Sequence, residues 1–162
     1  MIRIVVPFLS KRKTASYQDD VRYGQVTTIH PNMAYPAAKV SRVANRSYPG
    51  HDFFNDAFVK ILGFPIGTVS VTNGQRVGIY LTHDQHLYID QMGEGLANIV
   101  ALLSELAVNS GKLFLIEEPE NDLHPQALKA LLDLILESSK RNQFIISTHS
   151  NIVVPPPRQR RE

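Results

Sequence analysis

The chain has 162 residues, 43% hydrophobic and 20% charged, with a net charge of +2. This composition is typical of one globular domain with a sizeable core, and it excludes a disordered chain. There are no cysteines, so disulfides and thiolate metal sites are excluded. No apolar run approaches the roughly 20 residues that cross a bilayer, and residues 1–9 are too short for a signal peptide. We therefore expect a cytoplasmic protein with no membrane association.

The charge is unevenly placed along the chain. Residues 1–50 hold eight Lys and Arg against two Asp, a net +6, whereas residues 51–111 hold two against six, a net −4. Residues 112–162 balance at seven each. A basic amino-terminal segment could contact nucleic acid or another phosphate. The simpler interpretation is a solvated, irregular face, because no aromatic interleaving or nucleic-acid motif accompanies the charge.

The amino-terminal third carries weak structural signals. Residues 2–6 could form a strand, and residues 10–20 are polar and basic. Prolines between residues 31 and 49 break any long element there. Residues 55–62 can form a short helix that ends near Gly63.

Several short strands are predicted between residues 66 and 90. Residues with high β-propensity are concentrated at 68–71, 77–81 and 86–89. Asn73-Gly74, between the first two runs, is a strong hairpin signal. The sequence therefore predicts an antiparallel β-meander.

A helix-forming pattern begins after Gly95. Apolar spacing predicts an amphipathic helix over residues 96–109, and the apolar run 113–116 is typical of a buried strand. A second helix begins at Pro125, which suits a first helical position, and a second strand covers 144–146. Such a βαβ unit has parallel strands and a right-handed crossover. The buried stripe of its helix is predicted to contain Leu128, Leu131, Leu132, Ile135 and Leu136.

Polar residues stand at the ends of these elements. Glu117 and Glu118 directly follow the first strand, at the end where ligands bind in open α/β sheets. Ser147-Thr148-His149-Ser150 follows the second strand, whose tip lies beside the carboxylates in a βαβ unit. Gly93-Glu94-Gly95 precedes the helix, where glycines let the backbone approach a phosphate and the helix start offers free N–H groups. Each piece also has a plainer interpretation, because a lone histidine is more often structural and Gly93-Glu94-Gly95 could be a simple turn at a helix start.

Together and in this order, the three pieces resemble the carboxyl-terminal half of an ABC-type ATPase head. The closest resemblance is to the AAA-family ATPases related to the OLD (overcoming lysogenization defect) nucleases. The resemblance is carried by residues 91–152 and is weaker over residues 1–90. It implies that residues 1–152 form a partial ATPase domain. It implies an α/β, P-loop NTPase-like fragment with parallel core strands beside the antiparallel β-meander. Residues 153–162 form a Pro- and Arg-rich tail that cannot continue such a fold.

The resemblance also implies a role for each motif. Glu117 and Glu118 would be the Walker B pair, with Glu117 holding Mg²⁺ and Glu118 polarising the attacking water. His149 would be the switch histidine, the second catalytic residue beside Glu118. Nucleotide contacts would come from the signature loop and the D-loop, which are Gly93, Glu94, Gly95, Leu123 and His124.

Three of these positions depart from the ABC pattern. Glycine stands at position 93, where Ser is usual, and Glu117 stands where Asp is frequent. His124 replaces the Asp that is common in D-loops. By resemblance His124 lies at a dimer interface, but it could equally be an ordinary residue at the helix start before Pro125. Glu117-Glu118 could likewise be a solvated pair at a turn.

The phosphate-cradling loop G-x-x-x-x-G-K-[ST] does not occur in the 162 residues. In the resembled family it precedes every motif described above, so we expect the back part of a longer ATPase head. The implied function is Mg²⁺-dependent ATP hydrolysis in DNA repair or phage defence, by a homodimer or with a partner ATPase head, with DNA as a possible further partner. Two other functions stay open. One is a non-catalytic interaction module, and the other is a nucleic-acid-binding clamp built on residues 1–50.

Overall fold

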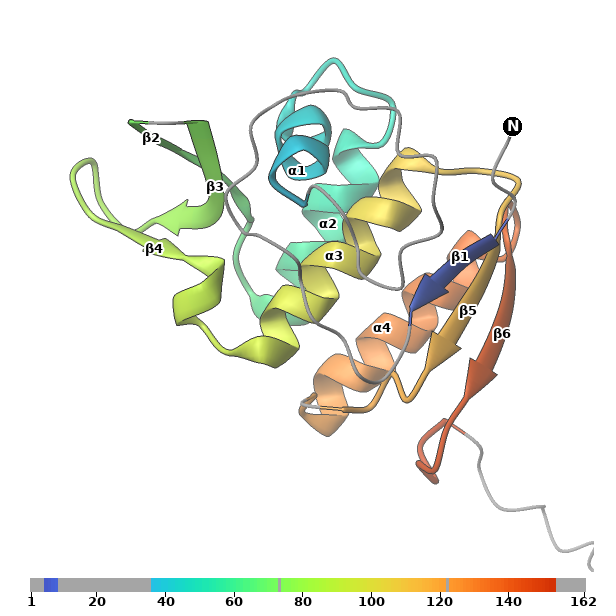
Figure 1. Cartoon of the computed structure of the whole chain (residues 1–162). Coiled ribbons are helices and arrows are strands. Elements are labelled where there is room, and N and C mark those ends of the chain that lie inside the picture. The colour runs from blue at the N-terminus through green and yellow to red at the C-terminus, as the bar shows by residue number, and fades with distance from the viewer. Residues whose placement is uncertain (1–4, 9–35, 73, 122, 154–162) are drawn as a thin grey trace, which may run out of the picture.

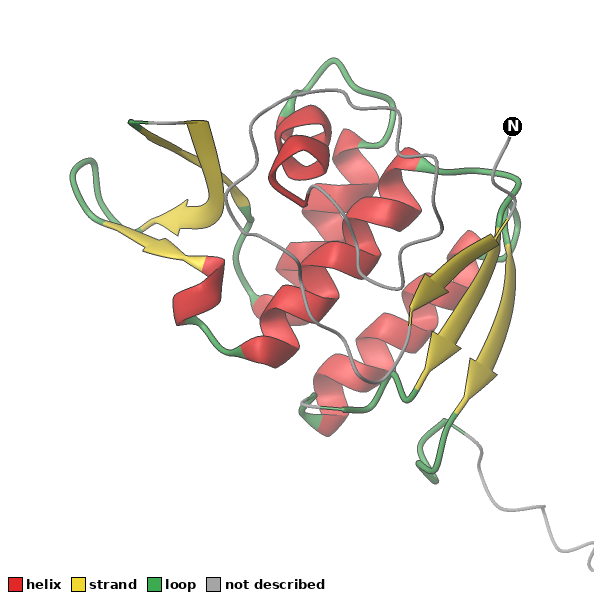
Figure 2. Cartoon of the chain, viewed as in Figure 1, coloured by secondary structure: helices red, strands yellow, loops and turns green. Residues whose placement is uncertain are grey.

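The computed structural model describes residues 5–8, 36–72, 74–121 and 123–153, with residues 36, 37 and 94 described by their backbone alone (Figure 1). Within these ranges the chain has one parallel and one antiparallel sheet, each of three strands. The helices lie between the two sheets (Figure 2). Most of the basic segment and of the predicted tail, residues 9–35 and 154–162, falls outside the described ranges.

The parallel sheet has the order β1-β5-β6. Its strands are β1 (Val5–Phe8), β5 (Leu113–Glu117) and β6 (Gln143–Ser147). In β5 the side chains of Phe114 and Ile116 are buried, and the alternate residues of the strand are half-buried, as the two-residue period of a strand requires. The predicted parallel pairing of the strands at 113–116 and 144–146 is confirmed.

Helix α4 (Pro125–Ser138) connects β5 to β6 and lies beside the parallel sheet (Figure 1). Pro125 is its first residue, as predicted, because a helix needs no N–H at that position. The prediction for the buried stripe is partly wrong. Leu136 is 71% exposed, and Leu134 is buried instead, because the helix presents a slightly rotated face to the core.

Helix α3 (Glu94–Val108) is the central helix of the fold. It was predicted to be amphipathic, but all side chains from Ala101 to Leu106 are buried. The reason is that α1 (Pro36–Ala44) and α2 (His51–Leu62) contact α3 as well. A helix covered on all sides tolerates apolar residues around its whole circumference.

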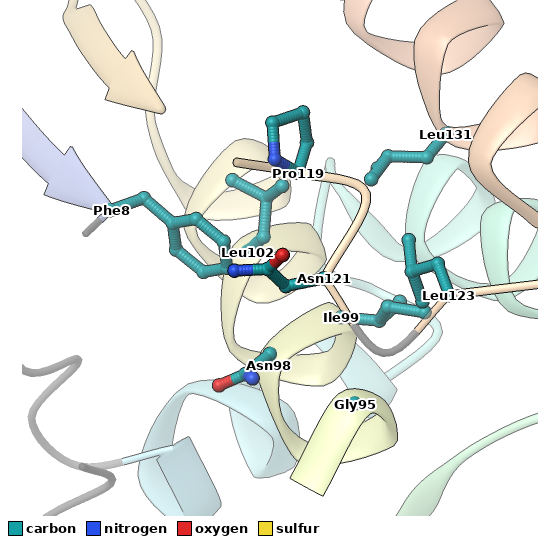
Figure 3. Close-up of a pocket in the computed structure, with 9 residues that line it drawn as sticks. All are labelled: Phe8, Gly95, Asn98, Ile99, Leu102, Pro119, Asn121, Leu123 and Leu131. Atoms are coloured by element: carbon teal, nitrogen blue, oxygen red, sulfur yellow. The ribbon is translucent and has the colours of Figure 1, made fainter. Parts of the chain in front are cut away.

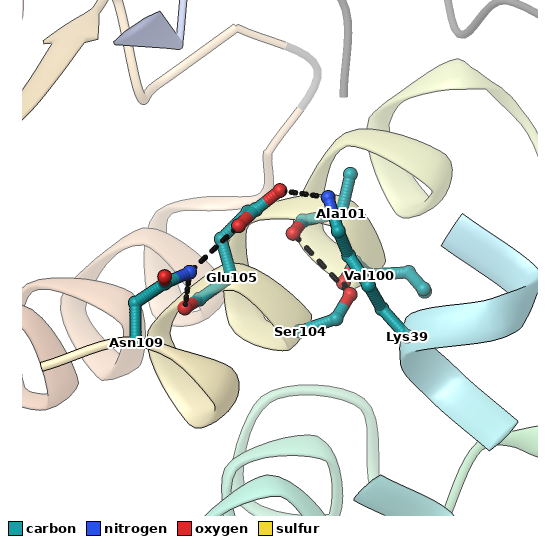
Figure 4. A network of polar contacts seen from close by, with 6 residues as sticks. All are labelled: Lys39, Val100, Ala101, Ser104, Glu105 and Asn109. Atoms are coloured by element: carbon teal, nitrogen blue, oxygen red, sulfur yellow. Dashed lines mark hydrogen bonds and ion pairs between the residues drawn. The ribbon is translucent and has the colours of Figure 1, made fainter. Parts of the chain in front are cut away.

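A partly buried ion pair joins α1 to α3 (Figure 4). Glu105 is 8% exposed, and its carboxylate pairs with the Lys39 ammonium and accepts a hydrogen bond of 2.8 Å from Asn109 Nδ2. A buried carboxylate is costly unless it is paired and hydrogen-bonded. Lys39 therefore explains in part why α1 is positioned on this side of α3.

Helix α1 was not predicted, and α2 begins four residues before its predicted start at position 55. Pro36 does not break a helix, because it is the first residue of α1. Gly50 precedes α2, and a Cβ atom there would lie 2.3 Å from the carbonyl oxygen of Ala107. This close approach of α2 to the end of α3 therefore requires glycine. Within the described residues, every helix is too short or too polar to span a membrane.

The antiparallel sheet has the order β2-β3-β4, which confirms the predicted meander. Its strands are β2 (Gly67–Val71), β3 (Gly74–Tyr80) and β4 (His86–Tyr88), and the one-turn helix η1 (Ile89–Gln91) leads on towards α3. Buried residues of this sheet, including Val77, join the same hydrophobic core as Phe114 and Ile116. The two sheets and the helices therefore share one core.

Candidate functional site

The ends of β5 and β6 lie side by side. Glu117 is paired with Ser147 in the parallel register. The next residue, Glu118, donates its backbone N–H to the carbonyl oxygen of Ser147 at 2.8 Å. Parallel strands finish at the same edge of a sheet, so the residues after β5 and the residues after β6 meet there. The structure thereby brings together the predicted Walker B pair and the loop that contains His149.

Glu118 has an unusual backbone. Its φ is +49°, the only positive φ of a non-glycine residue in the described chain. This left-handed conformation costs an L-residue about 1–2 kcal/mol, and such strain is concentrated at functional sites. The carboxylate is held on one side, where Oε2 accepts a hydrogen bond of 2.8 Å from Asn121 Nδ2. The loop after β5 therefore turns sharply and fixes this side chain.

The imidazole of His149 faces the same carboxylate. Its Nε2 lies 3.7 Å from Glu118 Oε1, and the side chain is 91% exposed, against 30% for Glu118. The ring is thus directed into solvent beside a carboxylate that is partly shielded. This arrangement gives a bound polar ligand access to an acceptor and to a ring nitrogen at one point.

Glu120 was not predicted as a site residue, yet it connects the two loops. Its Oε1 accepts a hydrogen bond of 2.7 Å from the Thr148 hydroxyl and one of 2.9 Å from the backbone N–H of His149. Burial raises the pKa of the Glu120 carboxyl, but hydrogen bonds from the Thr148 side chain and from the backbone of Glu120, His149 and Ser150 outweigh it and lower the pKa below its ordinary value.

Glu117, the predicted metal ligand, is the last residue of β5 and is half-buried. The alternation of the strand places it on the face opposite buried Phe114 and Ile116. No group of three metal-ligating side chains comes together in the described ranges. The assignment of Glu117 to Mg²⁺ therefore stays a prediction, which would use one carboxylate together with waters and substrate phosphates.

The predicted signature loop lies next to the predicted D-loop. Gly93 precedes α3 with a φ of +100°, and Gly95 is in the first turn of that helix. Gly95 and Leu123 both line a cavity of about 10 Å³ (Figure 3), which is close to the room that one water needs. Asn121, which holds the Glu118 carboxylate, lines the same cavity. The backbone of Glu94 is described, but its side chain lies outside the described part.

Leu123 and His124 also have structural contacts. Leu123 is half-buried and packs against the hydrophobic core. His124 is exposed and caps α4, because its Nδ1 accepts a hydrogen bond of 3.4 Å from the backbone N–H of Gln126. His124 therefore lies at the helix start, as its residue-level interpretation expects, and its proposed place at a dimer interface stays a prediction.

The chain is similar to one protein family and to several solved structures. The sequence profile of one family matches residues 7–154, and the family is described as "AAA domain, putative AbiEii toxin, Type IV TA system". Among curated proteins, none matches the chain. Several solved structures match it, and two of them are SMC ATPase structures.

The first is an SMC head bound to the C-winged helix domain of ScpA, with 22% sequence identity and a TM-score of 0.53. The similarity covers 72% of this chain and 36% of that one. The second comes from work on ATP-driven dimerization and DNA-stimulated activation of SMC ATPases, with 24% identity and a TM-score of 0.50. It covers 62% of this chain and 67% of that one.

These similarities confirm the predicted fold class, an α/β ATPase-head fold with parallel core strands and an antiparallel meander. The chain spans little more than a third of the first SMC head structure. The family match covers α3 and the loops after β5 and β6, where the site residues lie. The chain therefore belongs to this AAA-domain family.

Proposed function

We propose that the chain binds and hydrolyses Mg·ATP as part of an ATPase head whose phosphate loop is supplied by residues outside these 162. The observation that carries this proposal is the pairing of Glu118 with His149, 3.7 Å apart, at adjacent ends of two parallel strands. Catalysis of phosphoryl transfer rests mainly on positioning and on stabilising charge. A fixed carboxylate beside an exposed imidazole supplies both.

Each residue would perform one task. Glu118, held by Asn121, would orient the attacking water and attract its proton. His149, exposed to solvent, would donate a hydrogen bond from its ring to the terminal phosphate. Glu117 would hold the hydrated Mg²⁺, which neutralises charge on the phosphate oxygens when it is bound.

The free edge of β6 is where a strand leading to a phosphate loop could be added. Within the described residues β6 is paired only with β5, so its other edge has no strand partner. Ile145, at the middle of β6, is 60% exposed. An apolar side chain on an open strand edge favours pairing with another strand. We infer that the strand before the phosphate loop is added there, which would bring the loop to the strand ends near Glu118 and His149.

The neighbouring signature and D-loop residues favour a second head as partner. Gly95 and Leu123 line one cavity, so the two loops lie next to each other. One similar structure comes from a study of ATP-driven dimerization and DNA-stimulated activation of SMC ATPases. By analogy, we propose that two heads close around ATP and that DNA is the regulator. The resemblance to OLD-related ATPases supports a role in DNA repair or phage defence.

Paired variants test the proposal. The 162-residue chain alone should hydrolyse ATP at background rate, and a fragment or longer chain carrying the phosphate loop should restore turnover. In the restored head, Glu118→Gln should lower turnover by about 10²–10⁴-fold and leave ATP binding nearly intact, because Gln keeps the shape but accepts no proton. The control, Glu117→Gln, should weaken Mg·ATP affinity as well as turnover. If Glu118→Gln retains most of the turnover while Glu117→Gln binds Mg·ATP normally, the assignment is wrong.

The absent phosphate loop also favours a second candidate, a non-catalytic module that binds a complete head. Tight binding to such a head, with no turnover contributed by Glu118, would select this function over hydrolysis. A nucleic-acid clamp would instead need residues 1–50 and would show salt-sensitive DNA binding.

A further inference from the structure

The Glu120 side chain, in the loop after β5, is hydrogen-bonded to the backbone of His149, in the loop after β6. One carboxylate oxygen, Oε1, accepts from both Thr148 Oγ1 at 2.7 Å and His149 N at 2.9 Å. Thr148 Oγ1 in turn accepts from the backbone N–H of Ser150 at 2.9 Å. A single side chain thus holds three consecutive residues of a loop that is 28 residues away in the sequence.

The position of the His149 ring depends on this backbone contact. The ring is 91% exposed, and its contact with Glu118 is 3.7 Å long, which is too long for a strong hydrogen bond. The side chain therefore has little packing of its own to fix it. What fixes the loop is the charge-assisted pair of hydrogen bonds to Glu120, which are about twice as strong as neutral ones.

Asn121, next to Glu120, fixes the second group of the site, the Glu118 carboxylate. Asn121 holds the Glu118 carboxylate at 2.8 Å, while Glu120 holds the His149 loop. Both residues belong to the same turn between β5 and α4. The second oxygen of Glu120, Oε2, is buried without a hydrogen-bond partner in the described part of the chain. The hydrogen bonds that this carboxylate makes to other residues of that part are therefore all to the His149 loop.

We propose that Glu120 is a positioning residue that fixes the His149 loop against the Glu118 carboxylate, so that one turn places both groups. Its effect on turnover rests on the proposed function. Its effect on the His149 loop does not, because the hydrogen bonds exist in the chain without nucleotide. The lowered pKa of Glu120 agrees with a carboxylate that stays ionised at neutral pH.

Amide hydrogen exchange in the full 162-residue chain, followed by NMR, tests the positioning directly. Glu120→Ala should speed the exchange of the His149 amide by about 10- to 100-fold, as expected for the loss of a hydrogen bond to a charged group. Glu120→Gln, which keeps a carbonyl acceptor, should restore most of the protection. Glu137→Ala, an exposed glutamate on α4, is the matched control and should change nothing at His149.

The amides of Phe114 and Ile116 in β5 report on the fold in the same spectra. An unchanged His149 exchange rate in Glu120→Ala, with these core amides intact, overturns the proposal. If Glu120→Ala does not fold, Thr148→Val removes one donor at nearly equal volume. It should speed exchange at Ser150 and His149, and no change at either amide also overturns the proposal.

Turnover separates this inference from the proposed function. In a head with its phosphate loop restored, Glu120→Ala should lower kcat at unchanged KM, and Glu120→Gln should recover most of it. A purely structural role would lower the yield of folded protein and leave kcat per folded head unchanged, which would overturn the proposal. If the unmodified head shows no turnover, the proposed function fails, while the exchange result at His149 still decides the positioning role.

Discussion

The parallel and antiparallel sheets each have three strands, but they arrange their polar side chains differently. In the parallel sheet, β5 and β6 end at one edge, where Glu118 and His149 face each other. In the antiparallel sheet, β3 and β4 run in opposite directions. There the Arg76 guanidinium lies 3.9 Å above the Tyr88 ring and pairs with Asp90 of η1, so its charge is neutralised beside the sheet.

This difference shows how strand direction decides where functional side chains come together. Parallel strands bring the residues that follow them to one place, so two loops can build a site. Antiparallel strands send successive ends to opposite edges, and their polar groups pair with neighbours along the strand. We therefore expect substitutions at the strand ends of the parallel sheet to change activity, and substitutions in the antiparallel sheet to change stability alone.

The largest stability effect is expected from Phe114→Ala. The Phe114 ring is fully buried and stacks on Phe144 with ring centroids 5.3 Å apart. Its loss should lower the free energy of unfolding by about 3–5 kcal/mol. Tyr80→Ala, in the antiparallel sheet, is the matched control, because Tyr80 is 57% exposed and its removal should cost within about 0.5 kcal/mol.

Urea unfolding of both variants measures the contrast. If Phe114→Ala and Tyr80→Ala lower the free energy of unfolding equally, the antiparallel sheet contributes as much to the core as the parallel one. That result would contradict the difference between the two sheets.

Gly78→Ala should have an intermediate effect within the antiparallel sheet. A Cβ atom at Gly78 would lie 2.6 Å from the backbone carbonyl oxygen of Leu87, in the paired strand β4. Moving that strand should cost about 1–3 kcal/mol, as overpacking does. Gly67→Ala is the control, because a Cβ there meets no atom within 4 Å. Thermal unfolding should separate the two, and equal stabilities would mean that β4 moves away freely.

The smallest expected effect is a change in pH dependence at Glu120. Its pKa in the folded chain lies below 4.5, the ordinary value, so the folded state favours the ionised form. The resulting stabilisation is complete above about pH 4.5 and is lost as the pH falls through the folded pKa. Glu120→Gln has no such proton to bind.

The difference in free energy of unfolding between the unmodified chain and Glu120→Gln should therefore shrink as the pH falls below that value. Urea unfolding at a series of pH values measures it. A difference that grows towards acid would contradict the direction of the pKa shift.

Local sequence patterns predicted the elements of the parallel sheet and the meander because their signals are local. The apolar run before Glu117, the proline at position 125 and Asn73-Gly74 each specify a conformation within a few residues. The same patterns do not reveal what packs on the outer side of an element. That is why α3 was predicted to be amphipathic, and why Leu136 was placed in the core although it is 71% exposed.

The candidate site was predicted in part for a similar reason. Glu118 and His149 could be identified because each follows a strand, and strand order brings such positions together. Glu120 and Asn121 were missed because their role depends on side-chain direction inside a tight turn. Helix α1 was missed because proline can end a helix or begin one, and Pro36 begins α1.

The left-handed backbone of Glu118 has a consequence for anyone who tries to engineer this chain. Asn and Gly adopt that conformation more easily than Glu does. Screens that reward heat resistance alone will therefore favour replacing this residue, and each such gain would remove the proposed catalytic carboxylate. Stability favours a different residue at position 118, whereas the proposed catalysis requires a carboxylate. Only selection for function would therefore keep a glutamate there.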